Sequence, residues 1–116
     1  MTRTELINLV IMDACADDYE DRYQIYKLFD QVAPQMDNPP THAEINAQIL
    51  ELVADGLMAG YFLFTGVYEA PLDQLRDGLN TPYLGENGQD PYFYQTPKGK
   101  AVHAADDYWP FDEPFD

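Results

Sequence analysis

The stretch THAEINAQILELVADGL, residues 41 to 57, decides most of what the sequence predicts about the fold. Thr41 and Glu44 have the spacing of a capping box, in which two side chains satisfy backbone N–H groups at the start of a helix. An apolar stripe follows at helical spacing: Ile45, Ile49, Leu52 and Val53. Asp55 and Gly56 then supply a C-terminal stop. The pattern predicts a helix that buries this stripe and ends before Gly56.

Two further helices are expected upstream of this segment. Thr2 and Glu5 repeat the capping-box spacing before the first helix. The second carries a stripe at helical spacing, which consists of Ile25, Leu28, Phe29 and Val32. Carboxylates in the preceding cluster ADDYED complement the dipole of this helix, and they lack the spacing of a calcium loop. Pro34 ends the helix, and PQMDNPP is expected to be an extended linker.

Downstream of Gly56 the pattern changes to strands and turns. Residues 57–68 are expected to form a strand with a bulge at Gly60, residues 70–79 a short helix, and Asn87-Gly88 a hairpin-type turn. YFYQ, residues 92–95, is expected to be a second strand. Thr96 then caps a last helix that has Pro97 at its first position. The residues of this helix expected to face the core are Ala101, Val102 and Ala105.

Length and composition limit the class of protein. A chain of 116 residues, 46% hydrophobic, is expected to form one folded domain. Its apolar stretches are too short to cross a membrane, and its N-terminus lacks the basic region and cleavage site of a signal peptide, so a cytoplasmic location is expected. Cys15 is expected to be a small core residue.

Charge is the strongest global property of the chain. There are 21 acidic residues against 6 basic ones, which gives a formal net charge of -15. A protein of this charge is repelled by phosphates at long range and attracted to basic surfaces. Acidity of this degree also occurs in bacteria and halophiles for solubility alone.

The order helix, helix, helix, strand, wing, strand, helix resembles the winged helix-turn-helix family, particularly regulators of the PadR and MarR kind. Residues 21–32 are similar to the second helix of these proteins, residues 41–61 to the recognition helix and first wing strand, and residues 91–102 to the closing wing strand and the next helix. The resemblance implies an α+β winged-helix domain over residues 1–105. The expected domain has three helices, a two- or three-stranded sheet and a short C-terminal helix. It departs from the family in an enlarged wing and in an acidic aromatic tail, residues 106–116, which replaces the long C-terminal helix of many such regulators.

The chain departs from this family where DNA is normally contacted. The recognition helix reads base edges with Arg, Lys, Asn or Gln, and the corresponding outward positions include His42 and Asn46. No Arg or Lys lies between Lys27 and Arg76. Lys98 and Lys100 are therefore expected to pair with nearby Asp residues, not to form a DNA-binding patch.

Motifs of catalysis are lacking. His42 and His103 have no zinc-site spacing, no glycine-rich phosphate loop is present, and the sequence contains no serine. The chain is therefore expected not to be an enzyme and to need no metal or cofactor.

Aromatic residues are the strongest lead to a function. Nine tyrosines are more than a core of this size can hide, and Tyr and Trp are favoured at protein interfaces. The tail adds further aromatic side chains, which either cover the wing or dock on a partner. The expected interaction surface consists of His42, Asn46, Tyr68, Tyr83, Tyr108, Trp109, Phe111 and Phe115.

Three functions stay open at this point, in decreasing order of expectation. The first is a non-enzymatic protein that binds a basic protein partner, as a regulator or as an immunity protein that inhibits a nuclease toxin. The second is a DNA-binding transcriptional regulator, which charge disfavours. The third is an enzyme of unrecognised type. The sequence leaves the oligomeric state open, including a homodimer.

Overall fold

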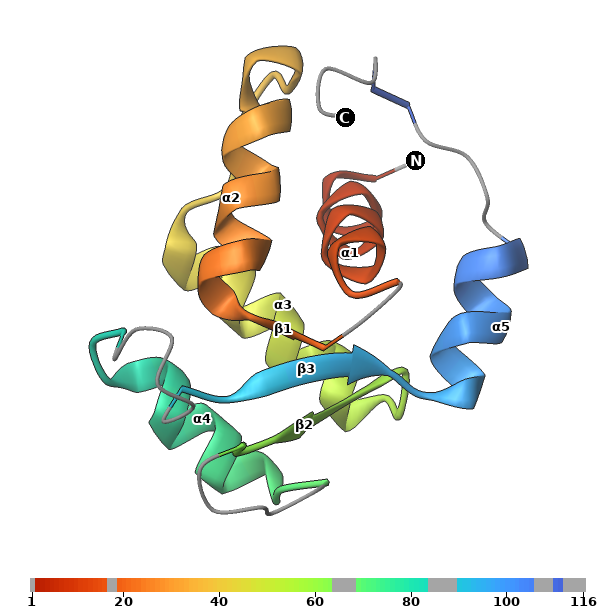
Figure 1. Cartoon of the computed structure of the whole chain (residues 1–116). Coiled ribbons are helices and arrows are strands. Elements are labelled where there is room, and N and C mark those ends of the chain that lie inside the picture. The colour runs from red at the N-terminus through yellow and green to blue at the C-terminus, as the bar shows by residue number, and fades with distance from the viewer. Residues whose placement is uncertain (1, 17–18, 64–68, 84–89, 106–109, 112–116) are drawn as a thin grey trace.

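The computed structural model describes residues 2–16, 19–63, 69–83, 90–105 and 110–111, and these form an α+β arrangement (Figure 1). The elements in chain order are α1 (Arg3–Ala14), β1 (Glu20–Asp21), α2 (Arg22–Val32), the 3-10 helix η1 (Ala33–Gln35), α3 (His42–Ala54), β2 (Met58–Tyr61), α4 (Leu72–Asn80), β3 (Tyr92–Gln95) and α5 (Pro97–Ala105). All five predicted α-helices are confirmed. The predicted linker after α2 begins instead with the 3-10 turn.

The helix starts follow the capping residues of the sequence. Thr2 and Thr41 each form a complete capping box, with Glu5 and Glu44 respectively. Asp21 caps α2, because its Oδ1 accepts a hydrogen bond from the backbone N–H of Gln24 at 3.1 Å. These side chains satisfy N–H groups that a helix leaves unpaired at its start.

The three described strands form one antiparallel sheet in the order β1-β3-β2. Strand β1 was not predicted, because two residues are too few to show an alternating pattern. Strand β2 is shorter than predicted and ends at Tyr61. Residues 64–68 of the predicted strand and the predicted Asn87-Gly88 turn lie outside the described residues.

Gly60 allows close packing between β2 and α4, and the prediction of a bulge at this residue is wrong. The register runs without interruption through the pair Gly60 and Phe93. A Cβ atom at Gly60 would lie 2.6 Å from Cδ2 of Leu75 and 3.1 Å from Cε1 of Phe93. Glycine therefore lets Leu75 of α4 pack directly against the backbone of β2.

The segments DGL, residues 55–57, and TPKG, residues 96–99, are joined by hydrogen bonds. Thr96 donates a backbone hydrogen bond to the carbonyl of Leu57 at 3.1 Å, and its hydroxyl donates to the carbonyl of Gly56 at 2.6 Å. The same hydroxyl accepts from the backbone N–H of Gly99 at 3.0 Å and so caps α5. A Cβ atom at Gly99 would lie only 1.9 Å from the Leu57 oxygen. The two motifs together fix the end of α3 against the start of α5.

The hydrophobic core lies between the helices and one face of the sheet. In Figure 1, α1 and α2 stand on one side of the sheet, with α4 and α5 near its opposite ends. The fully buried side chains of the core include Val10, Ile11, Ile25, Val32, Ile45, Ile49, Met58, Leu75 and Phe93. Ala101 and Val102 are exposed, so the prediction that they face the core is wrong. Helix α5 is held by the contacts of Thr96 and Gly99 at its first turn.

A buried ion pair joins α2 to the chain before β3. One guanidinium nitrogen of Arg22 lies 2.8 Å from Oδ1 of Asp90, and another donates to the carbonyl of Leu79 at 2.9 Å. The side chains are 5% and 1% exposed. Charges buried to this degree need a partner, since desolvation of each is costly.

Candidate functional site

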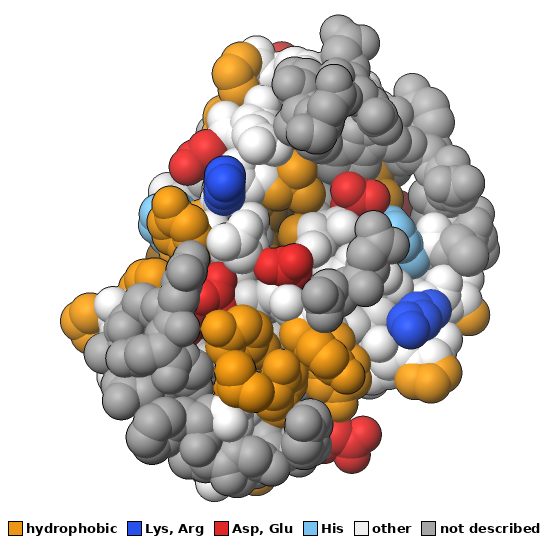
Figure 2. Space-filling view, viewed as in Figure 1, with side chains coloured by type: hydrophobic (Ala, Val, Ile, Leu, Met, Phe, Trp, Pro, Cys, Tyr) orange, Lys and Arg blue, Asp and Glu red, His pale blue; other side chains and the backbone are white. Residues whose placement is uncertain are grey.

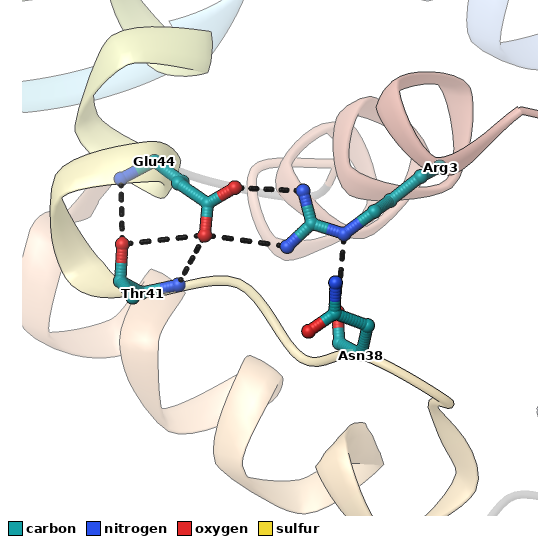
Figure 3. A network of polar contacts seen from close by, with 4 residues as sticks. All are labelled: Arg3, Asn38, Thr41 and Glu44. Carbon is teal, nitrogen blue, oxygen red and sulfur yellow. Dashed lines mark hydrogen bonds and ion pairs between the residues drawn. The ribbon is translucent and has the colours of Figure 1, made fainter.

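The N-terminal end of α3 is held by an ion pair with α1 (Figure 3). The guanidinium of Arg3 contacts both carboxylate oxygens of Glu44, at 2.7 and 3.2 Å, and its Nε donates to the carbonyl of Asn38 at 3.2 Å. Glu44 also accepts from the backbone N–H of Thr41 at 3.0 Å. Hydrogen bonds from Arg3 and Thr41 lower the pKa of the Glu44 carboxyl to about 2. The positive charge of Arg3 is therefore matched by a carboxylate at this end of the helix.

His42 and Asn46, the residues expected to be exposed for recognition, are both held by Tyr26 of α2. The imidazole of His42 stacks on the Tyr26 ring, with centroids 3.8 Å apart and planes 8° apart. The Tyr26 hydroxyl donates to Oδ1 of Asn46 at 2.5 Å. Burial raises the pKa of Tyr26, so its hydroxyl stays protonated as a donor. The structure thus joins these two predicted residues to each other through α2.

The cations of the chain do not gather at α3. The six Lys and Arg residues lie on α1, α2, α4 and α5, and the sequence of α3 contains none. Arg3 is paired with Glu44, and Arg22 is buried. Lys98 donates to the backbone carbonyl of Asp55 at 2.8 Å. It therefore lies at the C-terminal end of α3, where a cation complements the helix dipole.

Tyr83, another predicted surface residue, is part of a contact with the start of α2. Its hydroxyl donates to Oδ2 of Asp21 at 2.7 Å, and its ring stacks on Tyr23 with centroids 5.6 Å apart. The guanidinium carbon of Arg22 lies 5.7 Å from the centroid of the same ring. Tyr83 thus fastens the segment after α4 to α2.

Of the tail residues predicted to lie at the surface, the structure describes Phe111. Phe111 is 8% exposed and belongs to the hydrophobic core, so it differs from the exposed residue that the sequence predicted. Tyr68, Tyr108, Trp109 and Phe115 lie outside the described residues.

Tyr26 and Arg3 are the residues of this region that sequence reasoning missed. Arg3 and Glu44 are 41 positions apart in the chain, and no local pattern pairs them. Tyr26 lies beside the predicted apolar stripe of α2, and only the packing of α2 on α3 brings it to His42. The capping box at Thr41 was the one local signal that placed Glu44 correctly.

Among the described residues, the groups that bear on chemistry include metal-ligating side chains and the one cysteine. No group of three or more His, Cys, Asp or Glu side chains among them could hold a metal ion. Cys15 is buried in the core as expected. Burial raises the pKa of its thiol, which disfavours the nucleophilic thiolate.

The fold and this region together define an α+β protein with a small antiparallel sheet. In comparisons with family models, curated proteins and solved structures, nothing matches the chain. Within the described residues, no helix has both the length and the apolar character to cross a membrane.

Proposed function

We propose that this chain is a non-enzymatic winged-helix protein that binds a basic protein partner. The element order α1, β1, α2, α3, β2, β3 and the sheet order β1-β3-β2 support a winged-helix arrangement. Helix α4 occupies the place where the wing would be enlarged, between β2 and β3. A fold of this kind is compatible with several functions, so the function must be argued from the surface.

The observation that carries the proposal is the chemistry of α3. This helix contains no Lys or Arg, and the cation nearest its first turn, Arg3, is paired with Glu44. Its polar residues His42 and Asn46 are engaged by Tyr26. DNA affinity comes largely from neutralising phosphates with cations. A helix of this chemistry in a chain of net charge -15 favours a basic protein over DNA.

The partner is a protein whose own surface is strongly basic. A nucleic-acid-binding protein and a nuclease toxin are both of this kind, so the chain would act as a regulator or as an inhibitor of the immunity type. Attraction between surfaces of opposite charge speeds association and is screened by salt. We place this encounter in the cytoplasm.

The proposal is tested by recovery of a partner at two salt concentrations. The tagged full-length chain is incubated with a lysate of its source cells at low salt, and bound proteins are eluted by raising the salt. We expect one strongly basic protein, which then binds the purified chain in titration. Recovery of DNA in place of such a protein would overturn the proposal in favour of a transcriptional regulator.

A further inference from the structure

The outer face of the sheet is rich in tyrosine. Along β3, Phe93 and Gln95 point into the core, so Tyr92 and Tyr94 lie on the opposite face. Tyr61 of β2 is directly opposite Tyr92 in the register, and their ring centroids are 5.7 Å apart. Three tyrosines from two adjacent strands therefore share the outer face of the sheet, where Tyr92 and Tyr94 are partly exposed and Tyr61 is only 6% exposed beneath its neighbours.

A fourth tyrosine lies on this surface. The ring of Tyr19 meets Tyr61 and Tyr94 edge to face, with centroids 5.0 and 5.1 Å away. Tyr19 is 46% exposed. Figure 2 shows hydrophobic side chains gathered on the side of the molecule where β2 and β3 lie, with acidic side chains at the margin. We call Tyr19, Tyr61, Tyr92 and Tyr94 the tyrosine face.

An acidic pocket adjoins the tyrosine face. It has a volume of about 440 Å³ and is lined by Glu20, Asp21, Gln24 and Tyr92. Asp21 is 3% exposed and already accepts hydrogen bonds from Gln24 and Tyr83, so Glu20 is the partly exposed carboxylate of this pocket. Tyr92 therefore belongs to both the pocket and the face, and no cation lines the pocket among the described residues. The neighbouring pocket of about 250 Å³ along α2 shares Glu20 and Gln24 but includes Lys27. The described lining of the pocket that meets the tyrosines thus contains carboxylates and no cation.

We propose that the tyrosine face and its acidic pocket form the docking surface for an arginine-rich segment of the basic partner. A guanidinium is planar, stacks on aromatic rings and pairs with carboxylates, so one arginine can use both parts of this surface. Lysine presents a compact, strongly hydrated charge that gains less from the rings. This inference rests on the proposed function and adds the surface and the chemistry of the segment that it binds.

Single-stranded RNA also stacks its bases on aromatic sheet faces. Its phosphates need a positively charged groove, and the pocket beside Tyr92 carries carboxylates instead. Charge complementarity therefore favours the arginine-rich segment.

The test measures binding of labelled peptides to the full-length chain by fluorescence anisotropy. One peptide alternates Arg and Gly, and a second of equal length replaces every Arg with Lys. Tyr19→Ala should weaken binding of the Arg peptide about fivefold, since an aromatic ring at an exposed site contributes modestly to the binding of a cation. Tyr23→Ala is the matched control, because Tyr23 is 49% exposed but stacks on Tyr83. It should weaken binding less than about twofold.

Glu20→Gln supplies a second variant that removes a charge without removing packing. It should weaken the Arg peptide about threefold or more, and the Lys peptide should bind the unaltered chain more weakly than the Arg peptide. Equal effects of Tyr19→Ala and Tyr23→Ala would overturn this docking surface, and so would equal affinity for both peptides. The proposed function would still be supported in either case if a basic partner is recovered. Tighter binding of a poly-uridine oligonucleotide than of either peptide would overturn it in favour of RNA. Failure to bind any basic protein or peptide would overturn both proposals together.

Discussion

The hydroxyl of Tyr26 donates a hydrogen bond to Oδ1 of Asn46, which ties the middle of α2 to the first half of α3. The same ring stacks on His42, one turn earlier in α3. His42 remains exposed, as predicted, and Asn46 is half-buried, and both side chains contact Tyr26 and so help to hold α3 against α2. These polar contacts join α2 to the N-terminal half of α3, while Ile45 and Ile49 of α3 are buried in the core.

Tyr26→Phe should reduce the free energy of unfolding by about 1 kcal/mol, because it removes one hydrogen bond and leaves the ring that stacks on His42. The measurement is urea unfolding of the variant and of Tyr23→Phe. The control should change stability by less than about 0.5 kcal/mol, since the Tyr23 ring is half exposed. Adding Asn46→Ala to Tyr26→Phe should cost less than the sum of the two changes. A fully additive result would show that the bond contributes nothing.

Asp90→Ala should destabilise the protein by about 3–5 kcal/mol, because it leaves the guanidinium of Arg22 buried without its carboxylate. Replacing both residues, as Arg22→Met with Asp90→Leu, should recover much of this loss. Arg3→Met removes the cation of an exposed pair and should have a far smaller effect. Denaturant midpoints of the variants give the comparison. Equal losses for Asp90→Ala and Arg3→Met would contradict the burial described above.

Gly99→Ala separates packing from helix propensity. Alanine is better than glycine by about 1 kcal/mol inside an isolated helix, but here its Cβ would lie 1.9 Å from the Leu57 oxygen. The variant should lose about 3 kcal/mol, because backbone must move to relieve the clash. Gly56→Ala is the control: its φ is +78°, yet its Cβ would meet atoms only at 4.0 Å. It should lose about 1–2 kcal/mol from backbone strain alone. A stable Gly99→Ala variant would refute the close approach.

Glu44 gives the stability of the protein a defined dependence on pH. Its pKa is held at about 2, below the ordinary value of 4.5, chiefly by hydrogen bonds from Arg3 and Thr41. A depressed carboxyl pKa stabilises the folded state above pH 4.5, and this contribution is lost as the pH falls from 4.5 toward 2. Glu44→Gln should therefore show a weaker loss of stability across that window, as measured by urea unfolding at several pH values. An unchanged dependence on pH in the Glu44→Gln variant would contradict this role of the carboxylate.

The helices and their ends could be predicted because the signals for them are local. Thr2, Thr41 and Thr96 each cap a helix that begins where the spacing indicates. Strand β3 could also be predicted, since three of its four residues are aromatic and aromatic residues are favoured in strands. In each case the neighbours that decide the structure lie within a few positions in the chain.

Features set by distant segments could not be predicted in this way. The role of Gly60 depends on Leu75, and that of Gly99 depends on Leu57. At the candidate site, the sequence indicated His42 and Asn46 from their outward position, but their shared partner Tyr26 came only from the packing of α2 on α3. Phe111 was expected at the surface because the chain has more aromatic residues than its core was expected to hold, but its side chain is buried.

The most direct test of the account is the affinity of the purified chain for a labelled duplex of random sequence, measured by anisotropy over a range of salt concentrations. The account predicts no binding at about 10 µM protein in about 50 mM salt, because α3 has no cation to release phosphate counterions. Submicromolar binding that weakens steeply with salt, and that is lost when His42 and Asn46 are replaced by Ala, would contradict it.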